Sequence, residues 1–174
     1  IMLSRAIAND RTAAYNGSED QLQALAAFDA FYRNNLTTNT RFYAGIEPVL
    51  LELKTRGYQL ALVTNKAERY TLPLLEKLGA TTLFDVVIGG DTLAEKKPSG
   101  APLQHVATRL GITTEELLMV GDSANDALTA RNAGCLVYLV PHGYADPHQF
   151  DCDHVLRDSA ELLELLPLNP GSRD

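Results

Sequence analysis

The sequence predicts a doubly wound α/β fold, a parallel sheet with helices on both faces, preceded by a helical segment. From residue 45 onward, short apolar segments alternate with helical segments, and strands that are apolar throughout are buried on both faces of a sheet. In addition, four predicted helices are each followed by a glycine, the residue that most easily takes the left-handed conformation at a helix end. These glycines are Gly57, Gly79, Gly111 and Gly134.

The first 43 residues differ from the rest and predict two helices, at residues 1–14 and 19–34, with Asn-Gly-Ser between them. In the second helix the apolar side chains recur at nearly the 3.6-residue helical period. Such a segment fits a helical hairpin packed on a core or a lid over a site, and the residues alone favour the hairpin. We therefore expect two parts, residues 1–43 and an α/β core at residues 44–174.

The core is predicted element by element from its apolar runs and its glycine and proline residues. Helices are expected at residues 46–56, 67–78, 101–110, 124–133 and 159–166. Strands are expected at residues 60–63, 84–88, 117–120, 136–140 and 154–156. Residues 167–174 predict a loose polar terminus.

Composition limits the function. The net charge is −7 and the pI is near 5.0, which argues against nucleic acid or an anionic membrane as the main partner, because both require a basic face. No apolar run reaches membrane-spanning length and no secretory pattern is seen, so we expect a cytoplasmic enzyme. The two cysteines, Cys135 and Cys152, have no metal-ligand spacing. A homodimer is compatible with the sequence, which does not determine the oligomeric state.

Polar residues follow three of the predicted strands, at the edge where parallel sheets bind ligands. Thr64 and Asn65 follow strand 60–63, where a hydroxyl and the N–H groups that enter a helix can hold an anion; the same pair is also common as a simple helix cap. After strand 84–88, the chain leads to Lys97 and Pro98. Proline favours an extended residue before it, which would direct Lys97 toward the strand ends, although a solvated lysine is the alternative.

An acidic pair follows strand 117–120. Asp122 leaves the strand directly after Gly121, and Asp126 lies four residues later in the first turn of a helix, on the same side. Two neighbouring carboxylates repel each other unless a cation is present, and Mg²⁺ prefers oxygen ligands. The alternative is a helix capped by Ser123, with acids at its positive end. Gly121 is expected to let the backbone approach a ligand.

Together these motifs, in this order, resemble the haloacid dehalogenase superfamily of phosphatases. Thr64 matches the second family motif, Lys97 the third, and Asp122 with Asp126 the fourth. Within this superfamily the chain most resembles bacterial phosphoglycolate phosphatases. That resemblance rests on residues 63–66, 87–91, 96–98, 120–126 and 143–144. The likeness covers residues 44–166 well and residues 1–43 loosely, as the later part of a helical cap.

The resemblance implies a Rossmann-like core and Mg²⁺-dependent hydrolysis of a small phosphomonoester, with 2-phosphoglycolate favoured, through a phosphoaspartyl intermediate. It assigns Asp122 to the metal and Asp126 to ordering the metal's waters or Lys97, and so to catalysis. Thr64 and Lys97 would bind the phosphoryl group and act in catalysis, and Asn65 would help to bind the substrate. Another phosphatase or a sugar-phosphate mutase of the superfamily stays open, as does a truncated, non-catalytic phosphate-binding module.

The family's first motif, an apolar strand ending in Asp-x-Asp-Gly-Thr, is not found. Asp29 lies in a helical pattern without a second acid, and Asp151 and Asp153 follow no buried strand, so none is expected to be the nucleophile. The missing strand belongs in the middle of the family's sheet, where its loss would leave buried backbone groups without partners. Residue 1 is Ile and Met is second, and we expect that further N-terminal residues of the gene product carry this strand.

Overall fold

The computed structural model describes residues 16–143 and 145–167. The chain divides into two compact units, residues 1–40 and residues 41–174. The helix expected at residues 1–14 and most of the expected polar terminus lie outside the described residues. In the first unit, α2 spans Glu19–Asn34 and confirms the helix predicted at residues 19–34.

The second unit alternates helices with strands, as expected. Its helices are α3 (Ile46–Thr55), α4 (Glu68–Lys77), α5 (Ala101–Leu110), α6 (Ala124–Ala133) and α7 (Glu161–Leu165). Its strands are β1 (Ala61–Val63), β2 (Val86–Ile88), β3 (Leu118–Gly121), β4 (Leu136–Leu139) and β5 (His154–Val155). Two short 3-10 helices, Thr114–Glu116 and Pro147–Gln149, lie between these elements. Every predicted core element is therefore confirmed, with each end within two residues of its expected position.

The helix ends explain why the boundaries could be predicted so closely. Gly57, Gly79, Gly111 and Gly134 have positive φ angles of 85°, 67°, 72° and 78°. Side chains with a Cβ avoid this region, whereas glycine enters it without steric cost. The four glycines therefore end α3, α4, α5 and α6 where the sequence places them.

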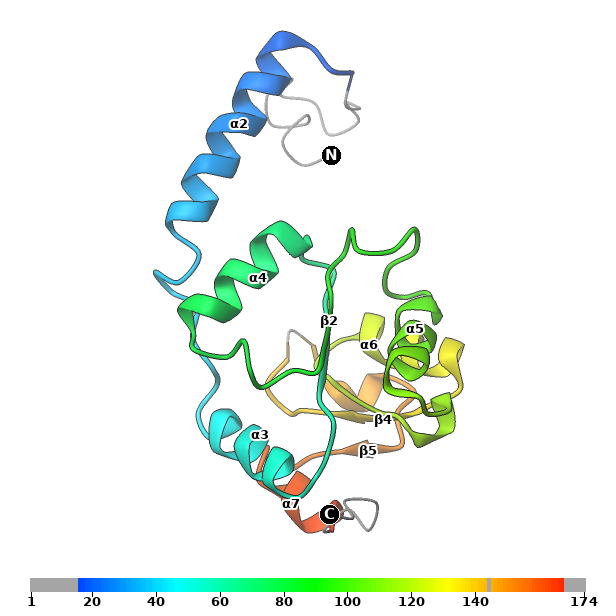
Figure 1. Cartoon of the computed structure of the whole chain (residues 1–174). Coiled ribbons are helices and arrows are strands. Elements are labelled where there is room, and N and C mark those ends of the chain that lie inside the picture. Colours follow the sequence, from blue (N-terminus) through cyan, green and yellow to red (C-terminus); the bar gives the residue numbers. More distant parts are fainter. Residues whose placement is uncertain (1–15, 144, 168–174) are drawn as a thin grey trace. The chain divides into compact units, whose positions relative to one another are not determined.

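The second unit has three layers (Figure 1). On one face of the strands, α5 and α6 pack on a core that contains Met119, Val137 and Leu139. On the other face, α3 and α7 pack against Val140 and Leu156, and α4 covers the side of β1 and β2 that α5 leaves open. Neighbouring strand residues thus alternate between two apolar cores, which is the doubly wound arrangement predicted from the sequence.

The strands form two separate parallel ladders. β1 pairs with β2, from Ala61 opposite Val86 to Val63 opposite Ile88, while β3, β4 and β5 form a three-stranded sheet. The side chain of Val63 nevertheless packs against the core beneath the second sheet. Among the described residues, no strand pairs with the outer edge of β1 or of β3. The two ladders are therefore separated between β1, which precedes Thr64, and β3, which precedes Asp122. This separation agrees with a missing central strand.

Within the described residues, none of the helices has the length and apolar character needed to cross a lipid bilayer.

Candidate active site

The candidate site lies where β1 and β3 end. Thr64 follows β1 directly, and Asp122 follows β3. Lys97 comes from the loop between β2 and α5, and Asp126 from the first turn of α6. The structure joins Lys97, Asp122 and Asp126 in one hydrogen-bonded group.

A buried ion pair forms the centre of the site. The Nζ atom of Lys97 lies 2.6 Å from Oδ1 of Asp126, and the two side chains are only 13% and 5% exposed. Lys96, its neighbour, is exposed. A charge pair taken out of water keeps its ionised form only where geometry and further hydrogen bonds support it. The side chain of Lys97 is therefore held in a fixed orientation by Asp126.

Asp126 receives those further hydrogen bonds on its other oxygen. Its Oδ2 accepts from the backbone N–H of Asp122 at 3.0 Å and from the hydroxyl of Ser123 at 2.7 Å. Burial alone would raise the pKa of Asp126, but the hydrogen bond and charge of Lys97, with the Ser123 hydroxyl and the Asp122 N–H, lower it below its usual value. Ser123 is thus at the cap position of α6, but its hydroxyl donates to Asp126 and makes no cap bond to the backbone.

Gly121 makes this packing sterically feasible. A Cβ atom at Gly121 would lie 2.3 Å from the Cβ of Asp126, far inside normal contact distance. The group that approaches this glycine is therefore the Asp126 side chain, whereas the sequence led us to expect a ligand. In the same way, a Cβ at Gly143 would lie 2.2 Å from the carbonyl oxygen of Asp122, so the loop after β4 is packed directly on the site.

Asp122 is a partly buried carboxyl close to Asp126. Burial and the negative charge of Asp126 raise its pKa above the usual value of a carboxyl, and a bound cation would relieve both effects. Both oxygens of Asp126 already accept hydrogen bonds, and the role of Asp122 as a metal ligand stays a prediction. In the described part of the chain no three His, Cys, Asp or Glu side chains are grouped for a metal. A single carboxylate suits Mg²⁺, which keeps several waters.

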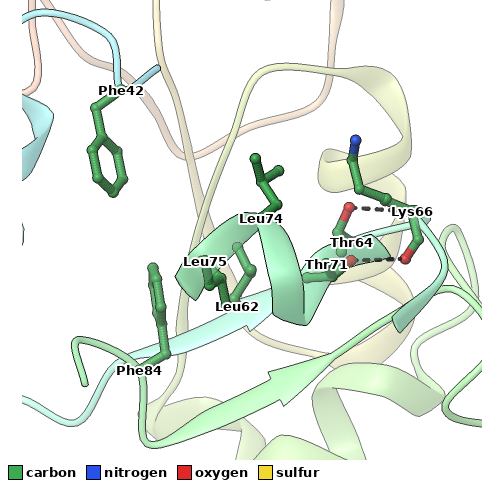
Figure 2. A pocket seen from close by; sticks show the side chains of 8 residues that line it. All are labelled: Phe42, Leu62, Thr64, Lys66, Thr71, Leu74, Leu75 and Phe84. Atoms are coloured by element: carbon green, nitrogen blue, oxygen red, sulfur yellow. Dashed lines mark hydrogen bonds between the residues drawn. The ribbon is translucent and has the colours of Figure 1, made fainter. Parts of the chain in front are cut away.

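Thr64 begins a tight turn that leads into α4. Its hydroxyl oxygen accepts a hydrogen bond from the N–H of Lys66 at 3.1 Å, and the Thr71 hydroxyl donates to the Lys66 carbonyl at 3.2 Å (Figure 2). Because the Thr64 oxygen acts as an acceptor here, its own proton can be donated to an anion. Thr64 also lines an open pocket of about 200 Å³, whose other lining residues are Phe42, Leu62, Lys66, Thr71, Leu74, Leu75 and Phe84 (Figure 2).

The Gly-Gly-Asp segment after β2 fixes the turn that follows Thr64. The N–H of Gly90 donates to the carbonyl of Lys66 at 2.8 Å, and the carboxylate of Asp91 accepts from the N–H of Glu68, the first residue of α4, at 2.6 Å. A Cβ at Gly90 would lie 2.2 Å from the carbonyl oxygen of Asn65. Sequence reasoning used residues 87–91 only as part of the family resemblance and gave them no structural role; two consecutive glycines at a strand end were the signal.

Asn65 is turned toward the lysine loop. Its side-chain amide donates to the backbone carbonyl of Lys97 at 2.9 Å, and the Lys97–Pro98 peptide bond is cis. The contact joins the loop after β1 to the loop that carries Lys97. The amide of Asn65 thus supports the lysine, and its proposed role toward substrate stays a prediction.

The acids rejected as nucleophiles take part in ion pairs elsewhere. Asp29 pairs with Arg33 on α2 at 2.6 Å. Asp151 and Asp153 both bind Arg131 of α6, at 3.0 and 2.9 Å. Their spacing serves to fasten α6 to the segment before β5.

The sequence model of the haloacid dehalogenase-like hydrolases matches residues 5–140. The chain belongs to this family. Its curated relatives include the phosphoglycolate phosphatase of Chromobacterium violaceum, 41% identical over 165 residues that make up 95% of this chain and 74% of the relative. The phosphoglycolate phosphatase of Nitrosospira multiformis is 41% identical over 147 residues, 83% of this chain and 65% of the relative.

Solved structures of haloacid dehalogenase-like hydrolases share the fold. A crystal structure of a predicted phosphoglycolate phosphatase from Haemophilus somnus 129pt has a TM-score of 0.81 and 32% identity, and the match covers 92% of this chain and 71% of that one. A family hydrolase from Geobacter sulfurreducens has a TM-score of 0.73 at 26% identity, over 88% and 75% of the two chains. The resemblance stated from the sequence motifs is thus confirmed.

Proposed function

We propose that this hydrolase is a Mg²⁺-dependent phosphatase that hydrolyses a small phosphomonoester, most favourably 2-phosphoglycolate. The observation that carries the proposal is the buried pair of Lys97 and Asp126 beside the carboxylate of Asp122. Phosphoryl transfer depends mainly on positioning and on neutralising the charge of the phosphoryl oxygens. The substrate follows from the names of the relatives at 41% identity.

Each residue has one part in this scheme. The ammonium group of Lys97 and the hydroxyl of Thr64 donate to the phosphoryl oxygens. Asn65 supports the loop that carries Lys97. Asp126 accepts a hydrogen bond from the Lys97 ammonium group and keeps it in place. Asp122 would hold Mg²⁺, which supplies positive charge to the phosphoryl group when bound.

The attacking carboxylate is proposed to lie outside the 174-residue sequence. In the mechanism implied by the family, an aspartate attacks phosphorus and is transiently phosphorylated, and a second acid protonates the leaving alcohol and then activates water. The unpaired edges of β1 and β3 support a strand between them, whose carboxyl end would lie beside Thr64 and Asp122. A cytoplasmic location stays a prediction from the sequence.

The test uses the protein expressed from its complete reading frame. It should release phosphate from 2-phosphoglycolate in the presence of Mg²⁺ and lose this activity in EDTA. Asp122→Asn should lower turnover by about 100-fold, as expected for loss of a preorganised charged group, and raise the Mg²⁺ concentration required for half-maximal rate.

Each outcome has a separate meaning. Full turnover in chelator would refute the metal assignment. Efficient turnover of another phosphomonoester, with none of 2-phosphoglycolate, would refute only the substrate. Phosphate binding without turnover would favour the non-catalytic module.

A further inference from the structure

The loop that carries Lys97 is fastened through two consecutive backbone carbonyls. The carbonyl of Lys97 accepts from the Asn65 amide at 2.9 Å, and the carbonyl of Pro98 accepts from the side-chain amide of Asn132 at 2.8 Å. The donors come from different elements, the turn after β1 and the last turn of α6. Two side-chain amides from different elements therefore hold the backbone of this loop by hydrogen bonds.

Carbonyls are the appropriate points of attachment here. Proline has no N–H, so residue 98 cannot fasten the loop by donating a backbone hydrogen bond. The lysine side chain is a long flexible stem, and its ammonium is placed reproducibly only if its own backbone is fixed. The two amides provide this without touching the ammonium group itself.

Asn132 and the partner of Lys97 belong to the same helix. Asp126 is in the first turn of α6 and Asn132 is six residues later, about 9 Å along a helix that rises roughly 1.5 Å per residue. A Cβ at Gly100 would lie 2.6 Å from the backbone of Asn132, so the loop end is pressed against this helix. One rigid element thus sets both the carboxylate that binds the lysine head and the amide that holds the lysine's backbone.

We propose that Asn132 is a positioning residue for Lys97, acting in phosphoryl transfer through the backbone of the Lys97–Pro98 loop without contact with substrate. This role rests on the proposed phosphatase function. Because Asn132 is exposed, its replacement opens no cavity, and its effect is carried by the single hydrogen bond to Pro98.

The kinetic test is a double-mutant cycle in the complete protein with 2-phosphoglycolate. Asn132→Ala should lower kcat about fivefold to tenfold, the size expected for one neutral hydrogen bond, with KM changed less than twofold. Asn132→Asp, which keeps the shape but loses the donor, should lose at least as much, and Asn132→Gln should recover part of the rate. In a Lys97→Ala background, Asn132→Ala should cause no further loss, since its effect passes through the lysine.

A matched control and a structural measurement complete the test. Gln104→Ala removes an exposed amide from α5 and should leave kcat and the melting temperature unchanged. An equal loss from Asn132→Ala with and without Lys97 would overturn the proposal. If the protein hydrolyses no phosphomonoester, a crystal structure of Asn132→Ala still decides: the proposal requires the Lys97–Asp126 contact to lengthen beyond 3.5 Å, and an unchanged 2.6 Å contact would contradict it.

Discussion

Two adjacent lysines allow an internal test of the site at the scale of a single residue. Lys97 is buried against Asp126 and Lys96 is exposed. In the complete protein, Lys97→Ala should lower kcat by about 100-fold or more, as other preorganised charge stabilisers do. Lys96→Ala removes the same charge from the same loop and should change kcat little. Steady-state kinetics of the two variants measure the difference.

Equal losses in the two variants would indicate that overall charge, rather than a placed ammonium group, supports the reaction. The folded state of each variant can be verified by its melting temperature. Lys97→Ala leaves Asp126 buried without its cation, which destabilises a protein, so turnover is to be compared below the melting transition of both variants.

Some site residues could be predicted from the sequence and others could not. Lys97 and Asp126 were predicted because, together with Thr64, they match the family motifs in order, and the structure joins the two side chains. Asn132 could not be predicted, since an asparagine near the end of a helix carries no local sign of a partner 34 positions earlier. A helix cap at Ser123 was the alternative interpretation, and only the structure shows that its hydroxyl donates to Asp126.

The loop after β2 has a role at the scale of secondary-structure elements. Gly90→Ala would bring a Cβ within 2.2 Å of the Asn65 carbonyl, so the turn after Thr64 must move. Small displacements of positioning groups have large effects on rate. We therefore expect the kcat of Gly90→Ala to fall about tenfold or more in assays of the complete protein.

Gly79→Ala is a suitable comparison. Gly79 has φ of +67° and no neighbour within 4 Å of an added Cβ, so alanine should cost about 1 kcal/mol of stability from the left-handed conformation. Its kcat should be unchanged below the melting transition. If Gly90→Ala lowers only the melting temperature, as Gly79→Ala does, the contact with Asn65 has no bearing on catalysis.

Secondary-structure elements were easier to predict than their contacts. Helices α5 and α6 were expected at the residues where they occur, because glycine ends both of them. Most strands were shorter than their apolar runs, as at β2, where Phe84 lies before the first paired residue. Apolarity measures burial, whereas a strand also requires a partner for its backbone.

At the scale of the whole molecule, the separation of the two ladders predicts instability. The 174-residue chain expressed by itself should show no cooperative thermal transition by circular dichroism or calorimetry and no phosphatase activity. β1 and β3 each present one edge without a strand partner among the described residues, and unpaired buried backbone groups are costly. The protein from the complete reading frame should melt cooperatively under the same conditions. A cooperative transition with measurable activity in the shorter chain would contradict this.

The sequence could predict this separation only through the family resemblance. The order of motifs at residues 64, 97 and 122–126 indicated the superfamily, and that resemblance placed the missing strand in the middle of the sheet. Local pattern alone predicts strands but not their neighbours, since apolar segments such as 60–63 and 117–120 look alike. Val63 packs against the apolar cores of both ladders. These contacts join residues that are far apart in the sequence, so local pattern does not reveal them.

The arrangement of the two ladders also has a consequence for the order of folding. β1 and β2 are joined through α4 alone, and β3, β4 and β5 are consecutive along the chain. The strands within each ladder are closer in sequence than the two ladders are to each other, and contacts that close shorter loops form sooner. The contacts between Val63 and the β3–β4 core close a much longer loop and should form later. We therefore expect hydrogen exchange to show early protection within each ladder and late protection where they meet.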